Sequence, residues 1–179
     1  KNCVPIALSA GFIEPLESTS IHLIQSGIFK LMWLFPDLGF DQAEIDEYNR
    51  LLIREYEQVR DFIILHYNAT ERKDSDFWND CRTMTIPDTL AAKVELWRGK
   101  GRNFRDQGDL FTEDSWIAVL LGQHIVPRSF DPLVHALPVP ETARFMAHLR
   151  EVIRNTAVAM PTHADFIAQH CAAQRPETV

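Results

Sequence analysis

The sequence has little glycine and cysteine, and it lacks the motifs of several well-known sites. It contains seven glycines and three cysteines in 179 residues. There is no Gly-x-Gly-x-x-Gly segment and no P-loop, so the chain has no phosphate cradle of its own for a nucleotide. There is also no Gly-x-Ser-x-Gly nucleophile elbow. A Ser-His-Asp site stays open, because its members need not be close in the sequence.

The histidines and cysteines do not follow a metal-binding pattern. No Cys-x-x-Cys or His-x-x-x-His pair occurs, and the spacing of His163, His170 and Cys171 does not suit metal ligands. We interpret these three residues as ordinary helix-surface residues and expect no metal. The odd number and wide separation of Cys3, Cys81 and Cys171 predict reduced thiols, which are typical of a cytoplasmic protein.

Basic residues are fewer than acidic ones. The 18 Lys and Arg residues against 25 Asp and Glu residues give a net charge of −7, which argues against a nucleic-acid or anionic-membrane binder. A hydrophobic share of 46% excludes a disordered chain. The longest apolar run, 21–35, is interrupted by polar residues and falls short of the ~18 residues of a membrane span. The first residues include no methionine and no signal-peptide pattern, so we expect a fragment of a larger protein.

The apolar pattern predicts a mainly α fold with one short leading strand. The strand is expected over Cys3–Leu8, isolated or at the edge of a sheet, and a turn of small residues follows it. Helices are predicted at 21–35, after three hydroxyl residues, and at 41–67, after an Asp-x-x-Glu capping box. Shorter helices are expected up to 84, at 89–98, up to 123, at 140–159 and from 161 onwards, and the first three of these have Ser75, Asp88 and Thr112 as their candidate N-caps.

The segment Gly11–Ile21 is the candidate site that the residues themselves indicate. A turn leads into a helix whose first backbone N–H groups have no partner, and such a terminus attracts an anion or a polarised carbonyl. Glu17 adds a carboxylate that can accept a proton or bind a polar N–H group. The alternative is that Glu14 and Glu17 are first-turn acids that stabilise the helix dipole, and spacing alone favours this alternative.

Residues 2–23, with the sequence NCVPIALSAGFIEPLESTSIHL, closely resemble the C-terminal part of the flavin-dependent tryptophan halogenases. Segments 47–67, 74–82 and 110–123 are similar to later helices of that family. The resemblance implies the helical, substrate-binding part of a glutathione-reductase-like FAD α/β enzyme. Residues 1–35 would complete the flavin and halide site, and residues 36–179 would form a substrate-binding subdomain.

The resemblance also implies an activity and site residues. In that family, reduced FAD from a separate flavin reductase reacts with oxygen and chloride or bromide, and the resulting oxidant halogenates an aromatic substrate. Glu17 stands at the family's essential glutamate, and Ser18 at the adjacent serine that helps to place the oxidant or the substrate. The expected halide and flavin contacts are made by the backbone, with Thr19 and Ser20 at the halide and Leu8 and Ile21 at the flavin.

Two departures from the family bear on the substrate. Members specific for free tryptophan usually have glycine where Ser20 stands, and neighbouring tyrosines where Trp116 and Ile117 stand. An indole-like or larger aromatic substrate is therefore as consistent with the sequence as tryptophan, and Trp116 is the candidate for contact with it. The family's flavin fingerprint, its catalytic lysine and its Trp-x-Trp-x-Ile-Pro segment do not occur in this chain.

Other functions stay open beside the halogenase. One is a flavin-dependent aromatic monooxygenase with the same fold, and another is a helical interaction module without catalysis. The resemblance is also compatible with a homodimer. Neither a nucleic acid nor a membrane is expected as a partner.

The remaining aromatic residues and histidines are expected to pack. Aromatic residues at helical spacing lie in the core more often than in a pocket. We expect core positions for Trp33, Trp78, Trp97 and Trp116. We likewise expect packing or hydrogen bonding, not catalysis, for His22, His66 and Tyr67.

Overall fold

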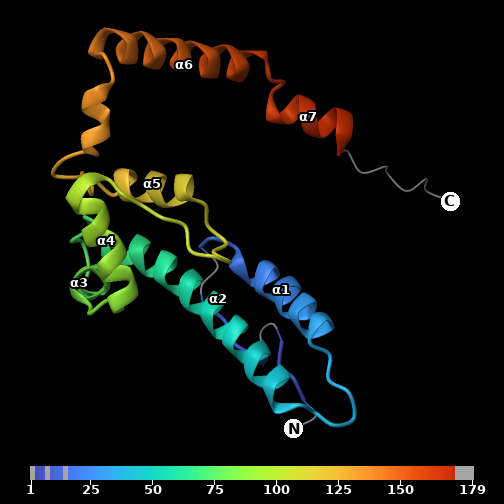
Figure 1. The fold of residues 1–179 in the computed structure, drawn as a ribbon. Coiled ribbons are helices and arrows are strands. Elements are labelled where there is room, and N and C mark those ends of the chain that lie inside the picture. Colours follow the sequence, from blue (N-terminus) through green and yellow to red (C-terminus); the bar gives the residue numbers. More distant parts are fainter. Residues whose placement is uncertain (1–2, 7–8, 14–15, 172–179) are drawn as a thin grey trace. The chain divides into compact units, whose positions relative to one another are not determined.

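The computed structural model describes residues 3–6, 9–13 and 16–171, and this part of the chain is mainly helical, as predicted (Figure 1). The chain divides into two compact units, Lys1–Asp131 and Pro132–Val179. The first unit contains α1 (Thr19–Trp33), α2 (Gln42–Asn68), α3 (Asp76–Thr83), α4 (Asp88–Lys100) and α5 (Glu113–Gly122). The second contains the 3-10 helix η2 (Pro132–Ala136), α6 (Val139–Ala159) and α7 (His163–His170). None of the described helices is both long and apolar enough to cross a membrane.

The predicted leading strand is not confirmed. Residues 3–6 have no regular secondary structure, and Leu8 lies outside the described residues. The Ile6 N–H donates a hydrogen bond to Ser9 Oγ at 3.1 Å, and that hydroxyl donates to the Ile6 carbonyl at 2.6 Å. Because the local turn uses the Ile6 N–H, this donor is not available to a neighbouring strand. The roles expected for residues 1–35, at the flavin and halide site, and for residues 36–179, as a substrate-binding subdomain, stay predictions.

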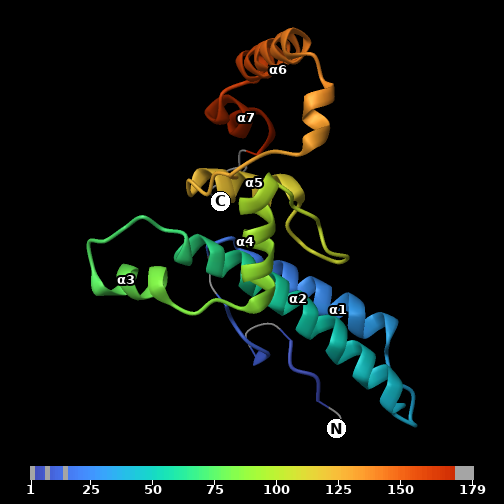
Figure 2. The ribbon, with the colours of Figure 1, turned by 60° about the vertical axis from the view of Figure 1, so that its left-hand side comes forward.

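Helices α1 and α2 lie side by side and form the frame of the first unit (Figures 1 and 2). Helix α1 buries one residue in each of its first three turns, at Thr19, Leu23 and Gly27. Leu23 packs with Val59 and Ile63 of α2 in a small apolar cluster. The helix that begins directly after the candidate site is therefore held against α2 along its first half.

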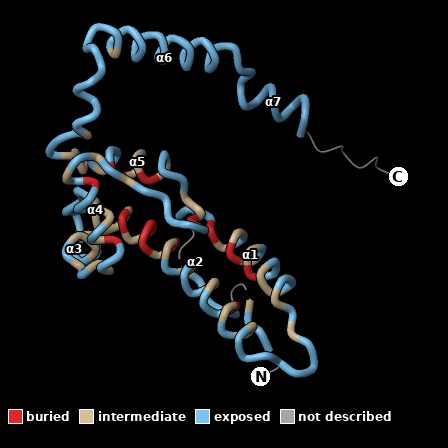
Figure 3. Tube along the Cα trace, viewed as in Figure 1, coloured by how far each residue is buried: buried red, intermediate tan, exposed pale blue. Residues whose placement is uncertain are grey.

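A larger core forms where α2 meets α4 and α5, and Figure 3 shows buried residues concentrated there and along the α1–α2 contact. Its buried members are Phe62, Leu65, Leu90, Val94, Trp97, Trp116 and Leu120. Two of the tryptophans expected in the core, Trp97 and Trp116, are in it. Trp78 is half-buried and stacks on Tyr67, with ring centroids 5.9 Å apart. The expectation for Trp33 is wrong: it is 77% exposed, because it lies off the buried stripe of α1.

The helix caps agree with the sequence pattern in part. Asp41 Oδ1 accepts a hydrogen bond from the Ala43 N–H at 2.8 Å, so Asp41 caps α2 as predicted. The predicted cap of α5 by Thr112 is also confirmed. Helix α4 begins one residue earlier than expected, with Pro87 and not Asp88 at its N-cap. Helix α7 begins at residue 163 and not 161.

Candidate active site

Glu17 precedes helix α1 and is joined to it by a strained residue. Ser18 is the N-cap of α1 and has φ 52° and ψ 31°, in the left-handed region that non-glycine residues rarely adopt. Its side chain makes no capping hydrogen bond, and the first turn of α1 contains no acidic residue. The alternative that Glu17 is a first-turn acid is therefore wrong, and Glu14 lies outside the described residues. Backbone strain of this kind concentrates at functional sites.

The Glu17 carboxylate lies next to His66, which comes from the last turn of α2. Glu17 Oε1 is 3.2 Å from His66 Nε2. The second ring nitrogen, His66 Nδ1, donates a hydrogen bond to the Phe62 carbonyl at 2.8 Å. Sequence reasoning missed His66 as a member of the site, because the two residues are far apart in the sequence. No local pattern in the sequence joins the two residues, so no signal could have found this contact.

His22 has the hydrogen-bonding role that its sequence context suggested. Its Nε2 is 2.8 Å from Glu55 Oε1, on the α1–α2 contact. The Ser26 hydroxyl donates to Glu55 Oε2 at 2.8 Å, and Lys30 Nζ lies 2.6 Å from the same oxygen. These three residues of α1 recur every fourth position, so they lie on one face of the helix. We refer to them together with Glu55 as the Glu55 cluster.

The N-terminus of α1 has the electrostatic character that an anion requires. Thr19 and Ser20 are its first two residues, so their backbone N–H groups belong to the unpaired donors of a helix terminus. No acid in the first turn offsets the positive end of the helix dipole. Thr19 is 2% exposed, whereas Ile21 is 67% exposed. Roles for these residues toward a halide or a flavin stay predictions, and Leu8 is not described.

Trp116 lies in the core and not directly beside Glu17. It is 1% exposed, and its ring meets Phe62 edge-on at a centroid distance of 4.9 Å. Lys93 Nζ lies 4.3 Å from its ring centroid, and Trp116 lines a cavity of about 310 Å³ together with Asp61. Its indole Nε1 has no hydrogen-bond partner among the described residues. The structure therefore connects Trp116 to the site through Phe62, and its contact with substrate stays a prediction.

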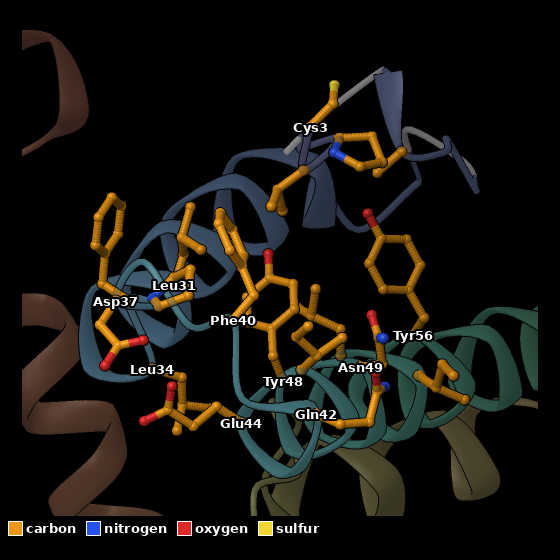
Figure 4. A pocket seen from close by; sticks show the side chains of 18 of the residues that line it. Cys3, Leu31, Leu34, Asp37, Phe40, Gln42, Glu44, Tyr48, Asn49 and Tyr56 are labelled. Atoms are coloured by element: carbon orange, nitrogen blue, oxygen red, sulfur yellow. The ribbon is translucent and has the colours of Figure 1, made fainter. Parts of the chain in front are cut away.

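A larger groove of about 1440 Å³ lies in the first unit, along α1 and α2 (Figure 4). Tyr48 and Tyr56 project from α2 into it, and Cys3 and Phe40 also line it. Burial raises the pKa of both tyrosines above the usual value, so both hydroxyls are neutral at physiological pH. Ile13 of the candidate segment Gly11–Ile21 lines this groove, whereas none of residues 17–20 does.

Comparisons with known proteins agree on one family. The family model of tryptophan halogenases matches residues 1–139. The tryptophan 6-halogenase SttH of Streptomyces toxytricini is 32% identical over 174 residues, which cover 93% of this chain and 32% of SttH. BrvH, a flavin-dependent halogenase from Brevundimonas sp. BAL3, is 47% identical with a TM-score of 0.89, over 94% of this chain and 34% of BrvH.

A second solved structure gives the same result. Xcc4156, a flavin-dependent halogenase from Xanthomonas campestris, is 46% identical with a TM-score of 0.92, over 99% of this chain and 36% of Xcc4156. The chain thus spans about a third of the length of these relatives. The family match and the similarity to SttH show that the chain belongs to the tryptophan halogenase family.

Proposed function

We propose that this chain forms the substrate side of the active site of an FAD-dependent halogenase, which uses oxygen and chloride or bromide to halogenate an aromatic substrate. The observation that carries the proposal is the placement of Glu17, outside the first turn of α1 and at the family's glutamate position. FAD, when bound, supplies the reaction of reduced flavin with oxygen and halide that generates the oxidant. A separate flavin reductase would deliver the reduced FAD, and the free cysteines support action in the cytoplasm.

Glu17 and the residues around it have separate roles in the proposed reaction. Hypochlorous acid and an aromatic C–H group give a C–Cl bond and water, so the ring carbon loses one proton. Glu17 accepts that proton or binds the polar hydrogen of the substrate, as a positioned carboxylate can. Ser18 has a hydroxyl that the helix cap does not use, and it is available to the oxidant or the substrate. The backbone N–H groups of Thr19 and Ser20 hold the halide, and the backbone of Leu8 and Ile21 contacts the flavin.

An indole-like aromatic is the substrate class that we propose, with tryptophan itself as one candidate. SttH is a tryptophan 6-halogenase and is 32% identical. BrvH and Xcc4156 are described as flavin-dependent halogenases, without a named substrate, and their identities of 47% and 46% are higher. The lower identity to the tryptophan 6-halogenase agrees with the presence of Ser20, because members specific for free tryptophan usually have glycine at this position. Trp116 would contact the aromatic ring.

The test uses the full-length protein with reduced FAD, oxygen and chloride or bromide. Tryptophan, indole and larger aromatic compounds are offered, and products are identified by mass spectrometry. Glu17→Gln removes the charge but keeps the size of the side chain. We expect this variant to lose arene halogenation by about 10²–10⁴-fold while it still oxidises reduced FAD at a near-normal rate.

Glu151→Gln, on the exposed surface of α6, is the matched control and should behave as the wild type. Hydroxylated products without halogen would indicate a monooxygenase instead. Absence of flavin oxidation in the wild type would favour the interaction module. A Glu17→Gln variant within about threefold of wild-type halogenation would remove Glu17 from the mechanism, because a positioned acid or base contributes far more than that.

A further inference from the structure

His66 contacts the Glu17 carboxylate from one defined side. Its Nε2 lies 3.2 Å from Glu17 Oε1, and the two side chains are 16% and 35% exposed. Among the described residues, this contact engages Oε1 and leaves Oε2 of Glu17 open to a ligand. Because Glu17 precedes the N-cap of α1, it receives no support from the turns of a helix. His66, from the neighbouring helix α2, contacts its carboxylate instead.

The His66 ring is itself held in place by the core. A carbonyl oxygen can only accept a hydrogen bond, so the 2.8 Å contact with the Phe62 carbonyl places a hydrogen on His66 Nδ1. The rings of Phe62 and His66 also meet edge to face, with their centroids 4.9 Å apart and their planes at 80°. Phe62 is 1% exposed. The imidazole is thus fixed in both rotation and tautomer.

The hydrogen on Nδ1 determines how the other nitrogen meets the carboxylate. In a neutral imidazole with Nδ1–H, Nε2 carries a lone pair, and a carboxylate oxygen opposite it carries lone pairs as well. With a hydrogen on Nδ1, the imidazole attracts the carboxylate when Nε2 is also protonated, and the two side chains then form an ion pair.

We propose that His66 is a positioning residue for Glu17: its contact with Oε1 orients the carboxylate, so that Oε2 faces the substrate as the proton acceptor. This inference rests on the proposed role of Glu17 in halogenation. The proton that leaves the ring carbon moves to Oε2 of the carboxylate, and the Nε2 proton stays on the His66 imidazolium. His66 therefore acts through Glu17 and has no contact with the reacting atoms.

A second histidine–carboxylate contact, among the residues that the structure describes, shows what a purely structural pair looks like. His22 also meets a carboxylate, but Glu55 is 6% exposed and has both Ser26 and Lys30 as further partners. No oxygen of Glu55 is left for a ligand. Glu17 differs, because it is a third exposed and His66 contacts one of its two oxygens.

Two substitutions of His66 separate positioning from packing in the full-length protein. His66→Gln places an amide nitrogen near the Nε2 position, where it can donate to Glu17 Oε1, but it loses the Nδ1 donor. His66→Asn keeps a donor for the Phe62 carbonyl and loses the contact with Glu17. If His66 positions Glu17, His66→Asn lowers the kcat of arene halogenation by about 10- to 100-fold and His66→Gln retains most of it, because misplaced groups cost up to about 10²-fold.

Further readouts exclude a folding defect and locate the effect. Reduced-flavin oxidation, the KM for the arene and the melting temperature should stay near wild-type values in both variants. In the Glu17→Gln background, His66→Asn should have little further effect on halogenation, because both changes remove one interaction. His148→Asn, at an exposed position of α6, is the matched control.

The opposite order of the two variants, with His66→Asn more active than His66→Gln, would overturn the inference and assign His66 to the Phe62 contact alone. Wild-type halogenation by both variants would also overturn it, provided that Glu17→Gln is inactive. If Glu17→Gln itself remains active, the proposed role of Glu17 fails, and the positioning role fails with it.

Discussion

Lys30 of α1 and Glu55 of α2 form an ion pair with Nζ and Oε2 2.6 Å apart, and their side chains are only 14% and 8% exposed. Lys30 also donates to the Ser26 hydroxyl. The Glu55 cluster therefore satisfies both oxygens of a buried carboxylate with donors from one face of α1. Removal of one partner of such a pair destabilises the folded protein, because it leaves the other charge buried and uncompensated.

Lys30→Met should destabilise the protein strongly. We expect a loss of about 3 kcal/mol in the free energy of unfolding, because Glu55 would lose its cation inside the α1–α2 contact. The double variant Lys30→Met with Glu55→Met should recover most of this loss, since it removes both charges. Urea unfolding of the full-length protein measures the effect, and Lys73→Met at an exposed position is the control. A single variant as stable as the control would contradict a buried pair.

Two substitutions of Ser18 separate its backbone from its hydroxyl. Glycine adopts the left-handed conformation without strain, so Ser18→Gly should keep the melting temperature close to that of the wild type. Ser18→Val should lose about 1–2 kcal/mol, because a branched side chain clashes in this conformation. Halogenation should fall in both variants if the hydroxyl helps to place the oxidant or the substrate. Full activity in Ser18→Gly would show that only the backbone conformation matters.

Gly101 ends helix α4 and is predicted to be intolerant of a side chain. It has φ +69°, and an added Cβ would lie 3.3 Å from Cγ of Pro127. Gly101→Ala should therefore cost about 1–2 kcal/mol of stability. Gly99→Ala is the matched control, because a Cβ there meets nothing within 4 Å, and alanine in a helix should add up to about 1 kcal/mol. Thermal unfolding of both variants should show shifts of opposite sign.

Residues 1–179 alone should bind FAD weakly or not at all. The sequence contains no glycine-rich phosphate cradle, and the expected flavin contacts at Leu8 and Ile21 involve backbone groups only. Isothermal titration calorimetry with FAD measures the affinity directly. Binding at micromolar or lower Kd would mean that the chain holds the cofactor by groups that its sequence does not reveal.

Local signals in the sequence predicted much of the helical fold, and the rest depends on contacts between distant segments. Asp41 and Thr112 cap their helices as expected, because a cap acts within three residues. The exposure of Trp33 could not be predicted, since it depends on which face of α1 meets α2. The contact of His66 with Glu17 was equally hidden, because no spacing rule joins a helix C-terminus to a turn far upstream.

The length of α2 couples the stability of the helix pair to the chemistry of the site. Glu55 and His66 are about three turns apart on α2, so both face the same direction. Glu55 forms an ion pair with Lys30 of α1, and His66 contacts Glu17, which precedes α1. A sliding of α2 along α1 would disturb both contacts at once. Substitutions in the Glu55 cluster, which does not include Glu17, are therefore expected to alter the rate of halogenation as well as the melting temperature.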